Sequence, residues 1–126
     1  MITQVSDSEL ELMKIIWANN GTALYAYIME QLAQAGKTWQ KNTVITLLSR
    51  LTEKGLLKTK KIGRRNQYIA VVSEADYQAA QTQTFVNKFY EGEAKGLVAT
   101  LIQREMLTAD DYDELKRFWE NQNEDI

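Results

Sequence analysis

Apolar and polar positions show their clearest period in the stretch from Thr38 to Tyr68. Four apolar residues there are spaced at i, i+3, i+4 and i+7: Val44, Leu47, Leu48 and Leu51. This spacing is typical of a helix that buries one face. Gly55 follows where a helix C-terminus favours a residue that tolerates positive φ, so the helix is expected to end near Lys54. Five side chains point away from the buried face and are free to contact another molecule: Asn42, Ile45, Thr46, Ser49 and Arg50.

A β-hairpin is predicted directly after this helix. Two strand-like runs, Leu57 to Ile62 and Gln67 to Val72, lie close together in the sequence. They flank the four residues Gly63-Arg64-Arg65-Asn66, whose Gly and Asn favour turns. The hairpin is therefore expected to carry two arginines in its loop.

Two further helices are predicted before this stretch. The first begins at the capping box Ser6-Asp7-Ser8-Glu9 and ends near Asn19-Asn20-Gly21. Its buried face is expected to carry Leu10, Met13, Ile16 and Trp17. The second helix follows at once and ends at Gly36, with an apolar row at Leu24, Ile28 and Leu32. The segment from Gly36 to Trp39 joins it to the third helix as a helix-turn-helix, and three helices closed by a hairpin predict a winged-helix domain over residues 1–72.

The remaining residues, 73–126, predict a C-terminal segment of three helices, so the fold class is mainly α with one small hairpin. Ser73-Glu74-Ala75-Asp76 and Thr108-Ala109-Asp110-Asp111 have the pattern of helix caps. Three helices in 54 residues bury too little apolar surface to be stable alone, so a second copy is expected to cover them in a homodimer, the alternative being a core within one chain. The expected dimer interface consists of Phe85, Phe89, Tyr90, Leu97, Val98, Leu101, Ile102, Leu115, Phe118 and Trp119.

Histidine and cysteine are both absent from the 126 residues. This excludes zinc, copper or iron ligation by imidazole or thiolate, cysteine nucleophiles, histidine bases and disulfides within the chain. We predict no catalytic residue, metal or cofactor, since an enzyme would have to use carboxylates, Lys or Tyr. No apolar run approaches the roughly 18 residues of a membrane helix. The N-terminus lacks the basic start and apolar run of a secretory signal, so a cytoplasmic protein without a membrane partner is expected.

Charge is divided unevenly along a chain whose formal net charge is −2. Residues 1–72 carry ten bases and five acids, whereas residues 73–126 carry five bases and twelve acids. Nine of the bases lie between Lys37 and Arg65, where Glu53 is the only acid. Because these charges fall on the helix-turn-helix and its hairpin, double-stranded DNA is the expected partner. The candidate contact residues are Lys41, Asn42, Thr43, Ile45, Thr46, Ser49, Arg50, Lys60, Arg64 and Arg65.

Two other interpretations of the basic stretch stay open. It can be a solvated surface, or it can dock a partner protein, in which case the chain would not be retained on DNA at low salt. In the DNA interpretation, Asn42 pairs with adenine and Ile45 contacts thymine methyl groups. The hydroxyls of Thr43, Thr46 and Ser49 then donate to phosphates or base edges, although they can also be ordinary helix-surface groups.

Two further groups of residues have both a structural and a functional interpretation. Four acids lie close together near the last predicted helix: Asp110, Asp111, Asp113 and Glu114. Carboxylates suit hard cations, but this spacing matches no calcium loop, and acids in the first turn are favoured by the helix dipole. Trp17 and Trp39 can line an effector pocket or, as is more common for such residues, belong to the core.

Several segments together resemble the penicillinase repressor family with its BlaI, MecI and CopY branches. They are Ile16-Trp17, Asn42 to Leu51, Glu53 to Leu57 and Phe85 to Tyr90. The resemblance covers nearly the whole chain and implies a dimeric winged-helix repressor of pseudo-palindromic operators built around TACA and TGTA half-sites. It also implies that Asn42, Thr43, Thr46 and Arg50 occupy DNA-contacting positions of the third helix and that Arg64 and Arg65 lie in the wing.

The chain departs from the family pattern at three places. Ile45 stands where members often carry Lys or Arg, which bears on the half-site preference. The residues Glu120 to Ile126 lack the paired Cys-x-Cys motif of copper-sensing members, so metal sensing of that kind is excluded. Where the β-lactam branch is cleaved at an Asn-Phe bond, this chain has Thr100-Leu101. Induction by a protease therefore stays open, and the inducer is unidentified.

Overall fold

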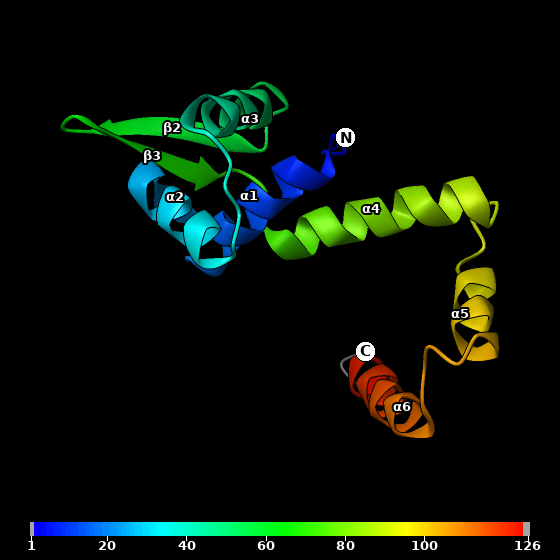
Figure 1. Cartoon of the computed structure of the whole chain (residues 1–126). Helices are drawn as coiled ribbons and strands as arrows, with labels where there is room; N and C mark the ends of the chain where they lie inside the picture. Colours follow the sequence, from blue (N-terminus) through cyan, green and yellow to red (C-terminus); the bar gives the residue numbers. More distant parts are fainter. Residues whose placement is uncertain (1, 125–126) are drawn as a thin grey trace. The chain divides into compact units, whose positions relative to one another are not determined.

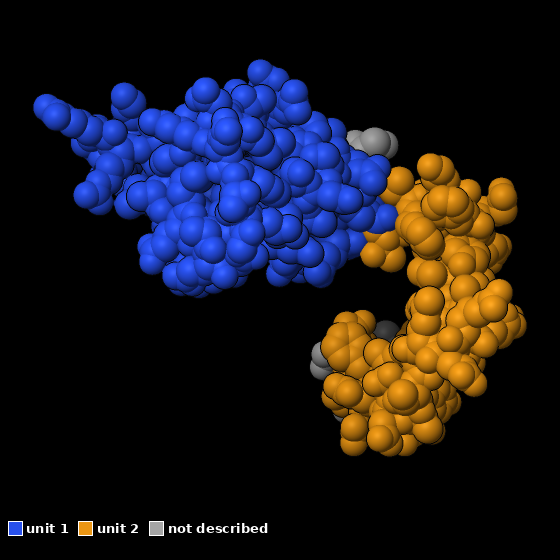
Figure 2. Space-filling model, in the orientation of Figure 1, with its two compact units in different colours: residues 1–81 blue, residues 82–126 orange. Residues whose placement is uncertain are grey.

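The computed structural model describes residues 2–124, and it divides the chain into two compact units. Unit 1 comprises residues 1–81 and unit 2 residues 82–126 (Figure 2). The sequence places the division after residue 72, at the end of the hairpin. The compact units divide nine residues later, inside helix α4 (Glu74–Phe89), because Tyr77 belongs to the core of unit 1.

Unit 1 contains three helices and a three-stranded antiparallel sheet, which confirms the winged-helix prediction (Figure 1). Its elements before α4 are α1 (Asp7–Ala18), β1 (Thr22–Leu24), α2 (Tyr25–Gln34), α3 (Lys41–Glu53), β2 (Leu57–Ile62) and β3 (Arg65–Ala70). The strand order is β1-β3-β2. In Figure 1 the turn between β2 and β3 reaches beyond the helices of this unit, as a wing does.

Strand β1 was not expected from the sequence, and the prediction that the second helix follows the first at once is wrong. Leu24, which was placed in the apolar row of that helix, lies in β1 and pairs with Gln67 of β3. Its backbone is extended, with φ −78° and ψ 152°, and α2 begins one residue later. A strand of three residues is too short to show a period of its own, and backbone pairing with β3 fixes it instead.

The hairpin turn is shorter than predicted. Ile62 pairs with Arg65, so Gly63 and Arg64 alone form the turn. Gly63 has φ +63°, a conformation that two-residue hairpin turns require and that glycine adopts without steric cost. Strand β2 has the predicted bounds, whereas β3 begins two residues before the expected position. Arg64 therefore lies at the tip, and Arg65 belongs to the strand.

The core of unit 1 lies where the three helices pack on one another and on the sheet. Its fully buried side chains include Leu12, Met13, Ile16, Ile28, Leu32, Val44, Leu48, Leu51 and Leu56. All four apolar positions predicted for α3 are buried. In α1 the buried face is centred on Leu12, while Leu10 and Trp17 are half-buried at its margins.

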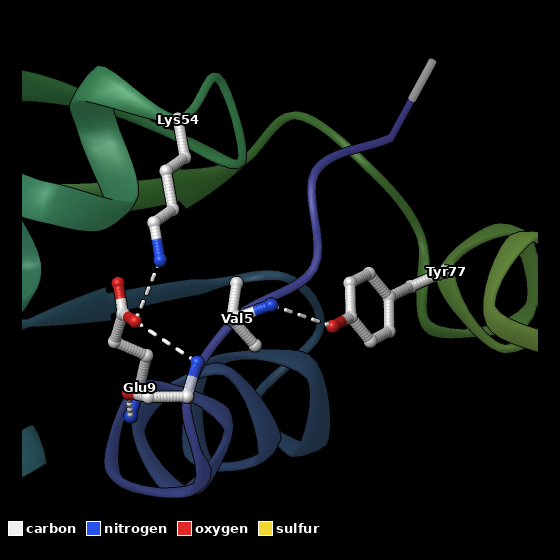
Figure 3. A network of polar contacts seen from close by, with 5 residues as sticks. Val5, Glu9, Lys54 and Tyr77 are labelled. Atoms are coloured by element: carbon white, nitrogen blue, oxygen red, sulfur yellow. Dashed lines mark hydrogen bonds and ion pairs between the residues drawn. The ribbon is translucent and has the colours of Figure 1, made fainter.

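A buried carboxylate fixes the N-terminus of α1 to the C-terminus of α3 (Figure 3). The capping box predicted at Ser6 is present, since the Ser6 amide donates to Oε1 of Glu9 at 2.9 Å and the Glu9 amide donates to the Ser6 hydroxyl at 3.2 Å. The same Oε1 accepts a hydrogen bond from Nζ of Lys54 at 2.8 Å. Burial acts to raise the pKa of Glu9, but the hydrogen bonds from Lys54 and Ser6 and the Lys54 charge outweigh it, so this pKa lies below its usual value.

Replacing Glu9 with Gln is expected to lower the free energy of unfolding at pH 7 by about 1 to 3 kcal/mol, because a charged hydrogen-bond acceptor is lost from the interior. Since the folded-state pKa is depressed, the Glu9 contribution is complete above the unfolded-state pKa of about 4.5 and is lost as pH falls through the folded-state value. Urea unfolding at pH 7 and pH 3 measures this. The difference between the wild type and Glu9→Gln should shrink on acidification, and Glu11→Gln on the same helix should show no such change. An equal difference at both pH values would contradict the role of the carboxylate charge.

Unit 2 contains the C-terminal part of α4, then α5 (Ala94–Gln103) and α6 (Ala109–Glu124). The cap predicted before α6 is confirmed: the Thr108 amide donates to Oδ2 of Asp111 at 2.9 Å, and the Asp111 amide donates to the Thr108 hydroxyl at 3.1 Å. The Tyr90 hydroxyl after α4 donates to Oγ1 of Thr100 in α5 at 3.0 Å. Gly96 allows this packing, because a Cβ there would lie 2.9 Å from Cδ1 of Tyr90.

Candidate nucleic-acid interface

The outward face of α3 carries the helix residues that the sequence predicted as DNA contacts. Seven residues of α3 outside the buried row are all exposed: Lys41, Asn42, Thr43, Ile45, Thr46, Ser49 and Arg50. Ile45 is 41% exposed, which is unusual for an isoleucine in a helix whose other apolar residues are buried. The helix therefore offers a mixed polar and apolar surface of the kind that reads base edges in a major groove.

The Thr46 hydroxyl was expected to donate to DNA, but its hydrogen is already used within the helix. This hydroxyl donates to the backbone carbonyl of Asn42 at 2.8 Å within the helix. A ligand therefore meets the free lone pair of the hydroxyl and the Thr46 methyl group. These groups suit a base amino group and a thymine methyl, respectively.

A shallow hollow of about 340 Å³ lies on one flank of this face. It is lined by Asn42, Thr43, Thr46, Leu47 and Arg50. The structure thus brings together the four residues that the family resemblance places against DNA. Arg50 stands two turns from Thr43 along the same flank, where it can reach a phosphate while Asn42 and Thr46 approach the bases.

A second hollow, of about 500 Å³, lies between α3 and the wing. Lys41 and Ile45 contribute from α3, and Arg64 and Arg65 contribute from the hairpin. The sequence did not predict the rest of its lining, which includes Tyr25, Asn66 and Tyr68. Pairing of β1 with β3 brings Tyr25 here, so the missed strand explains why Tyr25 was not predicted. Asn66 and Tyr68 belong to the predicted hairpin, but nothing in the sequence indicated that their side chains line a hollow.

Tyr68 is buried and is one of the residues that line this second hollow. Burial raises the pKa of Tyr68, and the nearby Tyr25 adds to the effect, while a hydrogen bond with Asn66 acts in the opposite direction. The hydroxyl therefore stays protonated at neutral pH. A neutral hydroxyl beside three bases can donate to an anionic ligand without weakening the positive potential of the hollow.

The bases of this surface have no acidic partner among residues 2–122, the part of the chain whose side chains the structure describes. The one ion pair in that range joins Lys54 to Glu9, away from the outward face of α3. Lys41, Arg50, Lys60, Arg64 and Arg65 are exposed and form no ion pair in that range. The first turn of α3 also lacks an acid, and the side chain of its N-cap residue Gln40 makes no capping hydrogen bond. The positive end of the helix therefore adds to the side-chain charges.

The apolar surface predicted for dimer contact lies in unit 2. Nine of the twelve large hydrophobic side chains exposed in the described part of the chain belong to this unit, and Val86 is its only residue among the buried hydrophobic ones. Of the ten predicted interface residues, Phe85, Phe89, Val98, Ile102, Leu115, Phe118 and Trp119 are exposed, and Tyr90, Leu97 and Leu101 are half-buried. Met106 and Tyr112 are also exposed, at 65% and 60%, and were not predicted as contacts.

Much of this apolar surface surrounds one hollow of about 770 Å³ within unit 2. Its lining includes Val98, Ile102, Leu107, Tyr112, Leu115 and Trp119. Tyr112 lies three residues before Leu115 and seven before Trp119, so the helical period of α6 would have identified it.

The remaining sequence motifs have structural roles. Trp17 packs against the core, and its indole N–H donates to the Val72 carbonyl at 2.8 Å. Trp39 is half-buried beside the same core, with Nζ of Lys37 5.9 Å from its ring centroid. Asp111 of the acidic group serves as a helix cap. Among the described residues, no three Asp or Glu side chains come together as metal ligands would, and no helix has the length and apolar character needed to cross a membrane.

Comparison with known proteins gives consistent matches. The family model described as "Penicillinase repressor" matches residues 5–121. The chain is 34% identical to the penicillinase repressor of Bacillus licheniformis over 94% of this chain and 91% of that protein. It is also 34% identical to the methicillin resistance regulatory protein MecI of Staphylococcus aureus (strain N315), over 90% of each. The solution structure of monomeric Bacillus licheniformis BlaI in complex with the blaP half-operator is similar with a TM-score of 0.51 and 38% identity, covering 61% of this chain and 92% of that one.

Proposed function

The chain belongs to the penicillinase repressor family, and from this premise we propose that it represses transcription by binding operator DNA as a homodimer. The observation that carries the proposal is a set of exposed bases on α3 and the wing, around a polar helix face, that have no acidic partner among the described side chains. The similar solution structure of the relative from Bacillus licheniformis contains that protein in complex with a half-operator.

In this proposal α3 lies in the major groove. Asn42 and Thr46 approach base edges, and Ile45 contacts thymine methyl groups, which TACA and TGTA half-sites supply. The Arg50 guanidinium, at the flank of the helix, binds a phosphate and fixes the register. Because Ile45 faces the hollow beside the wing while Asn42 and Thr46 line the other hollow, the two sides of α3 recognise different parts of a half-site.

The wing supports this arrangement by contacting the flanking backbone. Arg64 at the turn and Arg65 at the start of β3 are exposed at the far end of the hairpin, and Lys60 is exposed in the middle of β2. Together with Lys41 they place positive charge along one side of the half-site. Such contacts raise affinity for DNA of any sequence.

A second copy of the chain supplies the other half of the site. Unit 2 has almost no core of its own and exposes large apolar side chains from all three of its helical segments, so these side chains are expected to be buried against the same unit of a partner. Twofold symmetry then places the two α3 helices in successive major grooves, about 34 Å apart. The bound dimer blocks RNA polymerase sterically and needs no catalytic activity.

Substitutions on the two surfaces should have different effects on specificity. Arg64→Ala is expected to weaken binding to operator and random DNA by the same factor, because a phosphate contact is lost. Thr46→Ala and Asn42→Ala should also reduce discrimination against a single mismatch, which normally costs about 1 to 3 kcal/mol per base pair.

Competition gel shifts with single-mismatch duplexes measure this difference. Lys14→Ala, which removes an exposed base of α1 outside the proposed interface, is the control and should bind as the wild type does. Equal losses on operator and random DNA for Thr46→Ala would contradict the role of α3 in base recognition.

A further inference from the structure

Residues from the N-terminus and α1 hold the first turn of α4. Tyr77 is 6% exposed, and its hydroxyl accepts a hydrogen bond from the Val5 amide at 3.1 Å (Figure 3). Its ring lies 5.6 Å from that of Trp17, centroid to centroid. The Trp17 indole also donates to the Val72 carbonyl, just before the helix. All of these residues belong to unit 1, so the direction of the first turn of α4 is fixed within that unit.

The same N-terminal segment also holds the C-terminal end of α3. Glu9, four residues after Val5, accepts from Nζ of Lys54, which is the C-cap residue of α3. The Ser6 amide donates to the same carboxylate oxygen. Residues 5–9, here called the N-terminal bracket, therefore contact the DNA-reading helix at one end and the start of α4 at the other (Figure 3).

Helix α4 then runs without interruption from Glu74 to Phe89, and its last turns carry Phe85 and Phe89 of the proposed dimer surface. At about 1.5 Å per residue, the distance from Tyr77 to Phe89 is roughly 18 Å. A tilt of about 10° at Tyr77 would move the far end by about 3 Å, close to the rise of one base pair. Small changes at this anchor are thus large enough to matter for the spacing of two half-sites.

We propose that Tyr77 is a positioning residue for operator recognition: together with Trp17 and the N-terminal bracket, it fixes the direction of α4 and so restricts the half-site spacing that the dimer accepts. This inference rests on the proposed function. Tyr77 does not touch DNA, and its effect is exerted through α4.

The test measures affinity for three duplexes with inverted TACA/TGTA half-sites: one with the half-sites about one helical turn apart, one with a base pair added between them and one with a base pair removed. Tyr77→Phe removes the hydroxyl and keeps the ring, and Trp17→Phe removes the indole donor to Val72. In both variants, the affinity penalty for altered spacing should be roughly two- to tenfold smaller than in the wild type, as expected for one lost hydrogen bond. Affinity for an isolated half-operator should stay within about twofold, because α3 and the wing are unchanged.

Tyr27→Phe is the matched control, since it removes a hydroxyl from another tyrosine packed against the same core. It should leave the spacing penalty as it is in the wild type. A general loss of stability lowers affinity for all three operators together and does not change their ratio. An unchanged ratio in both Tyr77→Phe and Trp17→Phe would overturn the inference while leaving the proposed function in place. Failure of the wild type to bind any operator would overturn the proposed function and this inference with it.

Discussion

Replacing Trp119 with Asp is expected to lower the affinity for a two-half-site operator by about 10²- to 10⁴-fold, the advantage that two linked binding units have over one. Trp119 is 69% exposed in the single chain, so the substitution does not disturb a core within the chain. In the proposed dimer the same side chain is buried, and a carboxylate there would lose its hydration without gaining a partner. Binding to an isolated half-operator should change little, because unit 1 carries the DNA contacts.

Asn121→Asp is the matched control for this substitution. It adds the same charge to α6, two residues further along and on the opposite side of the helix from Trp119. Analytical ultracentrifugation should show a dimer at micromolar concentration for the wild type and Asn121→Asp, and a monomer for Trp119→Asp. A Trp119→Asp variant that stays dimeric and binds the operator normally would exclude this surface as the dimer interface.

Operator affinity is expected to fall by about 10³- to 10⁵-fold between 50 and 200 mM salt if the dimer neutralises roughly six to ten phosphates. The expectation follows from the exposed bases on α3 and the wing, since they form no ion pair in the described part of the chain and can all exchange counterions for phosphates. Such a slope would be unexpected from the net charge of −2 alone, which predicts repulsion from DNA.

Fluorescence anisotropy at several salt concentrations gives the slope of the logarithm of the binding constant against the logarithm of the salt concentration. Removing one base, as in Arg50→Ala, should reduce the slope by about two per dimer, because each protomer loses one phosphate contact. Lys14→Ala should not change it. A salt dependence close to zero would show that the basic surface is not the binding surface.

The helical elements were predictable because each depends on neighbours in the sequence. The α3 row of Val44, Leu47, Leu48 and Leu51 and its stop at Gly55 are local signals, and the structure places them as expected. The outward position of Asn42 and Thr46 follows from the same period. A basic stretch on such a helix then identifies the candidate surface without knowledge of the tertiary fold.

The parts that the sequence did not reveal depend on pairing between distant residues. Strand β1 has only three residues and is defined by its pairing with β3, so no alternation of apolar and polar residues predicts it. Tyr25 joins the lining of the hollow beside the wing through that pairing, which is why it was missed. The contact between Val5 and Tyr77 joins residues 72 positions apart, and a tyrosine at the start of a helix gives no sign of its partner.

The most direct test of the central claim is hydroxyl-radical footprinting of the wild-type protein on a duplex with two inverted TACA/TGTA half-sites, at about the ionic strength of the cell. Two protected patches, one on each side of the twofold axis and about one helical turn apart, are predicted. A duplex with scrambled half-sites should show no localised protection at the same protein concentration. Equal protection of both duplexes, or no protection of either, would contradict the conclusion that α3 and the wing read an operator as a dimer.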